Sequence, residues 1–222
     1  MDVLSAGSSL IGGRSENQDS YRMVPSLGLY CVADGVGGGL DGGVASQMAV
    51  TGIEKALSEG MPASAIFPHL QGEIYRYALA KYGQPAMGTT LTAALHKGGR
   101  RFHIIHVGDS RCYRMSPTQL IPVTEDHEFF DSGLGAMVLG SYLGMPTDTH
   151  PFLVFNEEIS LASGEALLLC SDGLYKQMEP EDIRLRFEQE HNLETFVQSL
   201  CATAAQIPQS DNVTVVCVSV HD

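Results

Sequence analysis

Apolar residues in this chain follow two patterns, one typical of strands and the other of helices. Near the N-terminus, short runs of apolar and β-branched residues are separated by turn residues, as in strands. The segments 42–58 and 63–81 instead repeat apolar residues at helical spacing, which predicts a pair of helices. The first strands are expected in VLSAGSSLIG (3–12), DSYRMV (19–24) and LGLYCVA (27–33).

The second half of the chain repeats this order of strands followed by helices. A hairpin is expected around Gly98 and Gly99, because strand-like runs flank this glycine pair. A polar and glycine-rich segment at 125–150 precedes two further strands, and two helices are expected at about 179–190 and 193–206. The other predicted strands are TQLIPVT (118–124), FLVFNEEI (152–159), EALLLC (165–170) and NVTVVCVSV (212–220).

The order of these elements predicts the fold class. Strands, a helix pair, more strands, a second helix pair and a last strand indicate an α+β protein rather than an alternating parallel sheet. We expect two antiparallel sheets packed face to face, with the helix pairs outside them. The chain has 222 residues, of which 44% are hydrophobic, and it lacks repeats, linkers and low-complexity tracts, so 1–222 is expected to form one domain.

Charge and hydropathy narrow the choice of partners. The net charge is −13, so we expect neither nucleic acid nor an anionic membrane as a partner. No stretch reaches the roughly 18 to 20 apolar residues that span a bilayer, and the start of the chain carries an acid where a signal peptide is basic, which predicts a cytoplasmic protein. The five cysteines lack CxxC spacing and are expected to be buried free thiols.

A glycine-rich loop follows the strand predicted at 27–33. Its sequence, CVADGVGGGLDGG (31–43), satisfies the GxGxxG spacing of dinucleotide-binding loops, but the residues after the next helix are turn-like and not a second parallel strand. A Walker-type loop would need lysine and then serine or threonine where Val44 and Ala45 stand. The simpler interpretation of this loop is that the glycines allow a tight turn and that Asp41 caps the following helix.

Four aspartates lie at the ends of apolar strands, in ADG (33–35), GDS (108–110), SDG (171–173) and SDN (210–212). A carboxylate is costly there unless it is hydrogen-bonded, paired or bound to a cation. Clustered carboxylates without cysteine or histidine ligands suit the hard cations Mg²⁺ and Mn²⁺, and two such ions can hold a hydroxide and a phosphoryl oxygen. The carbonyl of Gly35 is a candidate further ligand.

Six short segments occur in a fixed order along nearly the whole chain. They are RSENQDSY (14–21), VADGVGG (32–38), GTTLTAAL (88–95), HVGDSR (106–111), LLCSDGL (168–174) and SDNVTVV (210–216). Each is unspecific alone, but together they make the chain resemble the metal-dependent protein phosphatases of type 2C in their compact bacterial form. That family has a central sandwich of two antiparallel sheets flanked by helix pairs, in agreement with the order of elements predicted above.

The resemblance implies a set of metal ligands. Asp34 would bridge two metal ions, Mn²⁺ or Mg²⁺, and Gly35 would supply its backbone carbonyl. Asp172 and Asp211 would complete the two metal sites. Asp109 resembles a ligand of a third, weaker metal ion.

Two residues of the segment RSENQDSY are expected to act on phosphate and water. Asp19 resembles the residue that binds through metal-bound water. Arg14 matches the phosphate-binding arginine, and its guanidinium can hold phosphate oxygens in two places; the alternative is a surface arginine paired to Glu16. Asn212 is expected to support the neighbouring loop and not to contact metal.

The chain departs from the type 2C pattern in two respects. Many bacterial members have a histidine that could protonate the leaving group at the position where this chain has Gly39. The sequence therefore does not identify the general acid, and His127 and His150 are the histidines to examine. The segment between Asp109 and Asp172 also looks shorter than the usual flap subdomain, which leaves substrate selection and the third metal site open.

The function predicted from these motifs is that of a metal-dependent serine/threonine phosphoprotein phosphatase, in which a metal-bridging hydroxide attacks phosphorus. The implied partners are phosphorylated proteins, including a cognate Ser/Thr kinase and its substrates, and a monomer is expected. A cysteine-dependent phosphatase would need Cys-x5-Arg, but Lys176 stands at the arginine position after Cys170. The alternative from another class is a catalytically silent adaptor that binds a phosphoprotein or kinase.

Overall fold

The strands form two five-stranded antiparallel sheets and a separate hairpin in the part of the chain that the computed structural model describes, residues 2–36, 40–147 and 151–221. The first sheet has the order β1-β12-β11-β6-β7, the second β10-β5-β4-β3-β2, and the hairpin is β8-β9. The strands are β1 (Asp2–Leu10), β2 (Asp19–Val24), β3 (Leu29–Asp34), β4 (Leu91–His96), β5 (Arg101–Val107), β6 (Arg111–Ser116), β7 (Gln119–Pro122), β8 (Glu128–Asp131), β9 (Ala136–Leu139), β10 (Phe155–Ser160), β11 (Ala166–Cys170) and β12 (Val213–His221).

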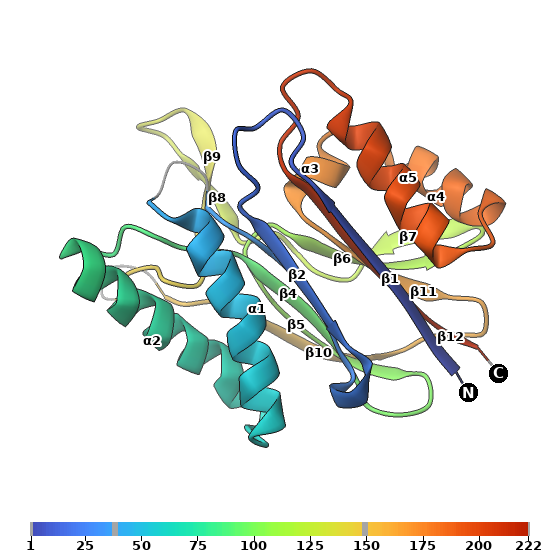
Figure 1. Ribbon diagram of the computed structural model, residues 1–222, viewed down its shortest axis with the longest axis horizontal. Helices are drawn as coiled ribbons and strands as arrows, with labels where there is room; N and C mark the ends of the chain where they lie inside the picture. Colours follow the sequence, from blue (N-terminus) through green and yellow to red (C-terminus); the bar gives the residue numbers. More distant parts are fainter. Residues whose placement is uncertain (1, 37–39, 148–150, 222) are drawn as a thin grey trace.

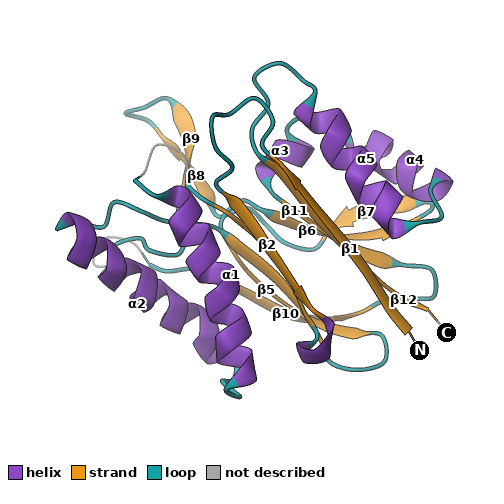
Figure 2. Ribbon diagram, in the orientation of Figure 1, coloured by secondary structure: helices purple, strands orange, loops and turns teal. Residues whose placement is uncertain are grey.

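The helices cover the outer faces of the two sheets. One pair lies on the β2 to β5 sheet, and the C-terminal helices lie on the sheet that contains β1 and β12 (Figures 1 and 2). The result is four layers in the order helix, sheet, sheet, helix. The helices are α1 (Gly42–Ser58), α2 (Ala63–Tyr82), α3 (Asp172–Tyr175), α4 (Pro180–Gln189) and α5 (Leu193–Ala205), with a 3-10 turn at Pro25–Leu27.

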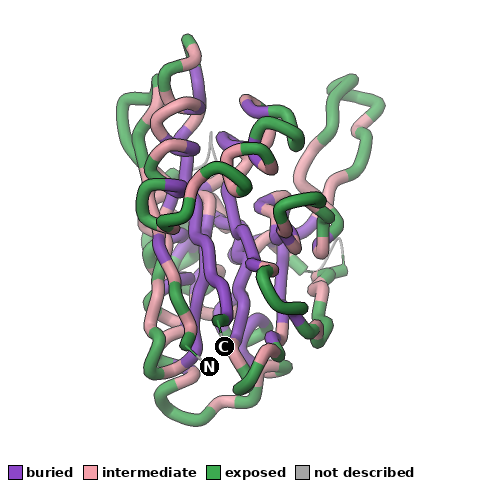
Figure 3. Tube along the Cα trace, turned by 90° about the vertical axis from the view of Figure 1, so that its right-hand side faces the viewer, coloured by how far each residue is buried: buried purple, intermediate pink, exposed green. Residues whose placement is uncertain are grey.

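Both faces of the central strands are buried, which explains their continuous apolar sequences. Along β3, Leu29, Cys31 and Ala33 pack on the side of α1 and α2, whereas Tyr30 and Val32 face the other sheet. Successive side chains of a strand point to opposite faces, so one apolar run supplies two cores. In Figure 3 the strands are buried in the interior, and exposed positions follow the outer helices and the loops.

The predicted α+β architecture is confirmed. The helices expected at 42–58 and 63–81 are α1 and α2, and the hairpin expected around Gly98 and Gly99 joins β4 to β5. The five cysteines are buried and free, as predicted. Among the described residues, no helix has both the length and the apolar character needed to cross a membrane.

Three local predictions differ from the structure. The strand expected at 152–159 begins later, at Phe155. The segment 125–150 contains the β8-β9 hairpin, which was not predicted because its apolar residues are adjacent and do not alternate: Phe129 and Phe130 are both exposed. A single helical turn, α3, directly follows β11, and one turn is too short to show helical periodicity in sequence.

The prediction that Asp41 caps α1 is wrong in its chemistry. Asp41 does occupy the position before the helix, but its side chain makes no capping hydrogen bond, and its backbone is left-handed, with φ 55°. The carboxylate instead accepts hydrogen bonds from Nζ of Lys81 and the hydroxyl of Tyr82. Asp41 therefore ties the start of α1 to the end of α2, and it takes no part in the site described next.

Candidate active site

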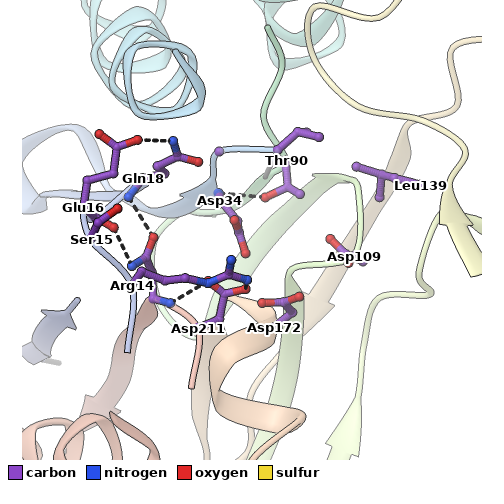
Figure 4. A pocket seen from close by; sticks show the side chains of 13 residues that line it. Arg14, Ser15, Glu16, Gln18, Asp34, Thr90, Asp109, Leu139, Asp172 and Asp211 are labelled. Carbon is purple, nitrogen blue, oxygen red and sulfur yellow. Dashed lines mark hydrogen bonds and ion pairs between the residues drawn. The ribbon is translucent and has the colours of Figure 1, made fainter. Parts of the chain in front are cut away.

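Strand ends from both sheets meet at one edge of the sandwich. Asp34 ends β3 and is paired across the ladder with Asp19 at the start of β2. Asp109 lies between β5 and β6, Asp172 follows β11 by one residue, and Asp211 precedes β12. A pocket of about 320 Å³ opens at this edge, and Figure 4 shows the aspartates around it. Its lining includes Arg14, Asp34, Gly35, Asp109, Asp172 and Asp211.

Asp19 lies beneath the pocket and joins the two sheets. Its Oδ2 accepts a hydrogen bond of 2.7 Å from the hydroxyl of Ser171, and the same hydroxyl oxygen accepts one of 3.0 Å from the backbone N–H of Thr214. Burial raises the pKa of Asp19 to about 6; hydrogen bonds to Thr214 and Ser171 oppose this shift, and the charge of Asp172 adds to it. The sequence therefore places a costly carboxylate between the sheets.

Asp34 is held by backbone contacts at the end of β3. Its N–H donates to Oγ1 of Thr90 at 2.9 Å, and its carbonyl accepts from the N–H of Thr90 at 2.9 Å. Burial raises the pKa of Asp34 well above its ordinary value, and the negative charges of the four neighbouring aspartates raise it further. A cation in the pocket would oppose this shift, because a nearby positive charge favours the ionised carboxylate.

Arg14 contacts a carboxylate of the pocket and not Glu16, which was the surface alternative. Its Nη2 donates to Oδ2 of Asp211 at 2.6 Å, while the Glu16 carboxylate accepts from Nε2 of Gln18. The hydrogen bond and the charge of Asp211 raise the pKa of Arg14. With 56% of its side chain exposed, Arg14 can contact Asp211 and a ligand in the pocket.

Asn212 fastens the loop that carries Arg14 to the start of β12. Its Nδ2 donates to the carbonyls of Ile11 at 2.8 Å and Glu16 at 2.9 Å, and its Oδ1 accepts from the N–H of Gln18 at 2.8 Å. These three bonds agree with the predicted supporting role. They bring a loop from the N-terminus of the chain next to residues about 200 positions later.

Gly35 lies where the loop after β3 passes closest to α1. A Cβ atom at this position would come within 2.4 Å of the backbone of Gly42 and 2.8 Å of the carbonyl oxygen of Gln18. Only glycine avoids these contacts without a shift of the backbone. Gly35 also lines the pocket, and its role as a ligand stays a prediction.

The pocket has the donor chemistry that hard divalent cations prefer. Its candidate donors are oxygens, and two buried carboxylate atoms, Oδ1 of Asp19 and Oδ1 of Asp172, make no hydrogen bond. Burial, with the charge of Asp172, also raises the pKa of Asp109 to about 6. As they stand, no three acidic, histidine or cysteine groups among the described residues converge closely enough to hold an ion.

Of the two histidines considered as proton donors, His127 lies within the described residues and His150 lies outside them. Gly39, where many type 2C phosphatases have a histidine, also lies outside the described residues. His127 does not line the pocket. Its Nδ1 accepts from the N–H of Gly108 at 3.2 Å, and its ring lies 4.9 Å from that of His106. Burial lowers the pKa of His127, so it is a neutral support of the turn before β6.

Sequence reasoning missed four residues of this region. Thr90 and Ser171 stand inside the quoted motifs GTTLTAAL and LLCSDGL, where their polar character at buried strand ends was a usable signal. The position of Lys176 beside the pocket could not be predicted, because it depends on the helical turn α3, which brings the Lys176 side chain next to that of Asp172. Leu139 belongs to the unpredicted hairpin and lines the pocket, and no sequence signal pointed to it.

Comparison with known proteins places these features in context. The chain matches the family described as Stage II sporulation protein E (SpoIIE) over residues 29–221. It is 29% identical over 231 residues to the serine/threonine protein phosphatase PstP of Mycobacterium tuberculosis, in a match that covers 94% of this chain and 43% of that protein. It is 28% identical to the serine/threonine phosphatase stp of Listeria monocytogenes, covering 93% of this chain and 88% of stp. The chain thus spans less than half the length of PstP.

Solved structures share the fold over nearly their whole length. The serine/threonine phosphatase of S. agalactiae superposes with a TM-score of 0.87 at 25% identity, covering 99% of this chain and 100% of that one. The catalytic domain of PstP in complex with two manganese ions superposes with a TM-score of 0.80 at 28% identity, covering 99% of each chain.

Proposed function

The chain belongs to the SpoIIE family, and on this premise we propose that it is a metal-dependent phosphatase that removes phosphate from serine and threonine in other proteins. The observation that carries this proposal is the pocket in which four aspartates from separate strand ends gather beside Arg14. The serine/threonine phosphatases among its relatives support the same activity. We further propose that residues 1–222 act as one catalytic domain.

Asp34, Asp172 and Asp211, with the carbonyl of Gly35, are the proposed ligands of two divalent cations, Mn²⁺ or Mg²⁺. The two manganese ions in the PstP catalytic domain support this assignment. When bound, such ions supply a water-derived nucleophile and neutralise charge on the phosphoryl oxygens. Asp109 stands at the edge of the pocket, where the type 2C resemblance implied a weaker third ion.

Asp19 and Arg14 are proposed to orient water and to bind the phosphate group. Asp19, whose Oδ1 makes no hydrogen bond in the structure, would accept hydrogen bonds from water if metal ions were bound. Arg14 uses its guanidinium to hold oxygens of the phosphate group, because its planar donors match that geometry. Its contact with Asp211 keeps the guanidinium at the mouth of the pocket.

A covalent route through cysteine has no support in this site. Cys170 is buried in β11, and burial raises its pKa above that of a free thiol, which disfavours the reactive thiolate. None of the residues that line the pocket is a cysteine or a histidine among those the structure describes. Water is therefore the proposed nucleophile.

The proposed substrates are phosphorylated proteins, and a cognate Ser/Thr kinase and its targets are the proposed partners of a monomeric enzyme. The pocket lies at an edge of the sandwich, where a phosphorylated side chain on another protein can reach it (Figure 4). The substrate protein itself is set by surfaces outside the pocket.

Hydrolysis of p-nitrophenyl phosphate and of a phosphothreonine peptide separates an enzyme from an adaptor. The chelated chain is expected to be inactive, and Mn²⁺ is expected to restore phosphate release. Asp34→Asn should stay inactive at every Mn²⁺ concentration. Binding of the phosphopeptide without release of phosphate in saturating Mn²⁺ would favour the adaptor.

A further inference from the structure

A lysine side chain lies between two carboxylates at one edge of the pocket. Nζ of Lys176 is 2.7 Å from Oδ2 of Asp172 and 3.9 Å from Oδ2 of Asp109. The two aspartate side chains are only 16% and 14% exposed, so their charges are poorly screened by water. The lysine ammonium thus occupies a position at which both carboxylates can be neutralised at once.

The short helix α3 fixes this position. Asp172 begins the helix and Lys176 follows its last residue, four positions later, so the two side chains lie on the same face. Tyr175, on the same turn, donates its hydroxyl to the backbone carbonyl of Asp109 at 3.0 Å, and the guanidinium of Arg111 stacks 3.6 Å from the Tyr175 ring. The turn that carries Asp109 is therefore tied to the helix that carries Asp172.

The lysine is charged in this environment. The ordinary pKa of a lysine lies well above neutral pH, and Nζ of Lys176 donates a hydrogen bond of 2.7 Å to the Asp172 carboxylate. Half of the side chain is exposed, and its stem reaches the carboxylates from the solvent side.

We propose that Lys176 supplies, between Asp109 and Asp172, the positive charge that a third divalent cation would otherwise supply. The inference rests on the proposed function, because it assumes that Asp34, Asp172 and Asp211 hold the other two cations. The chain then binds two divalent cations tightly, and the ammonium group of Lys176 occupies the position of the third cation between Asp109 and Asp172.

The physical basis is repulsion and competition for the same oxygens. An ion bound by Asp109 and Asp172 would lie within a few ångströms of Nζ, where like charges repel strongly at low screening. The same ion would also have to displace the hydrogen bond between Lys176 and Asp172. The two other metal positions share only Asp172 with the lysine, because Asp34 and Asp211 make no contact with Lys176 among the described interactions.

Calorimetric titration with Mn²⁺ alone, with the bound metal counted by mass spectrometry after dialysis, tests the proposal without reference to activity. Lys176→Gln removes the charge and keeps most of the stem, Lys176→Arg keeps the charge, and Lys55→Gln is the matched control. Lys55 is exposed on α1, with 73% of its side chain in solvent. Thermal melting in chelator checks that each variant folds.

We expect two Mn²⁺ ions per chain in the wild type, in Lys176→Arg and in Lys55→Gln. Lys176→Gln should bind a third ion at least tenfold more tightly than the wild type does, and the further change Asp109→Asn should abolish that gain. A third ion bound equally by the wild type and Lys176→Gln would overturn the inference while leaving the proposed function intact. No Mn²⁺ binding to the wild type would instead overturn the proposed function and the inference with it.

Discussion

Asp19 allows a quantitative test of the strain that the carboxylates place on the fold. The residue is 8% exposed, and burial raises its pKa from an ordinary 3.8 to about 6. A shift of about two units corresponds to about 3 kcal/mol, since one unit is worth about 1.4 kcal/mol. Because the folded-state pKa of this acid is the higher one, the folded chain binds more protons than the unfolded chain between about pH 4 and 6. The free energy of unfolding therefore falls as the pH rises through this range.

The substitution Asp19→Asn removes the charge and keeps the size of the side chain. Its amide oxygen can still accept from Ser171, although a neutral acceptor makes a weaker hydrogen bond than a carboxylate. We expect a gain of about 3 kcal/mol in the free energy of unfolding at pH 8 in chelator, because the pKa of about 6 already includes the hydrogen bonds that the carboxylate accepts. At pH 4 the gain should be close to zero.

Urea unfolding followed by circular dichroism at pH 4, 6 and 8 measures this difference, with the exposed Glu157→Gln on β10 as the control. In thermal melts the gain at pH 8 corresponds to about 6 to 12 °C for a chain of this size. Saturating Mn²⁺ should reverse the order, because an ion stabilises the chain that binds it better. A less stable Asp19→Asn at pH 8 in chelator, or a difference that does not change with pH, would refute the reasoning.

Three further predictions follow from the site. Arg14→Ala should raise KM for a phosphothreonine peptide about tenfold or more while Mn²⁺ affinity stays near that of the wild type, and Arg14→Lys should recover part of the loss; an unchanged kcat/KM would return Arg14 to a surface role. Gly173→Ala should cost about 3 kcal/mol or more in urea unfolding, because its Cβ would lie 2.0 Å from the carbonyl oxygen of Asn212, and wild-type stability would show that the two segments are not in close contact. Across aryl phosphates of graded leaving-group pKa, kcat should depend steeply on the leaving group in the wild type and equally in His127→Ala; a flat wild-type dependence that becomes steep in His127→Ala would identify His127 as the acid.

The order of elements was enough to predict the sandwich. Strands such as β3 and β12 are predominantly apolar on both faces, which excludes a sheet exposed on one side. The helix pairs between groups of strands exclude an alternating parallel sheet. The β8-β9 hairpin could not be predicted in this way, since its residues are largely exposed and carry no alternation. Its stability comes from pairing and turn bonds, such as the Asp131 carboxylate with the N–H of Gly133, and not from a buried face.

The site was predictable for a related reason. Aspartates next to buried strands in the sequence must lie at strand ends. The location of Asp34, Asp172 and Asp211 at an edge of the sandwich was therefore predictable. The contacts that decide their chemistry depend on geometry that sequence does not report. The sequence favoured Arg14 as a phosphate-binding residue but left a pair with Glu16 open, and the structure shows its contact with Asp211. Lys176 gained a role only because α3 makes one turn.

The central claim is that the carboxylates of the pocket hold the ions that drive phosphoester hydrolysis. Its most direct test is the initial rate of phosphate release from a phosphothreonine peptide, measured across a Mn²⁺ titration for the wild type and Asp34→Asn in parallel. The account predicts a saturable, Mn²⁺-dependent rate in the wild type and a loss of at least a hundredfold in Asp34→Asn, because a neutral amide is a much weaker ligand for a divalent cation than the carboxylate proposed to hold it. Equal rates for the two proteins, or full wild-type activity in excess chelator, would contradict it.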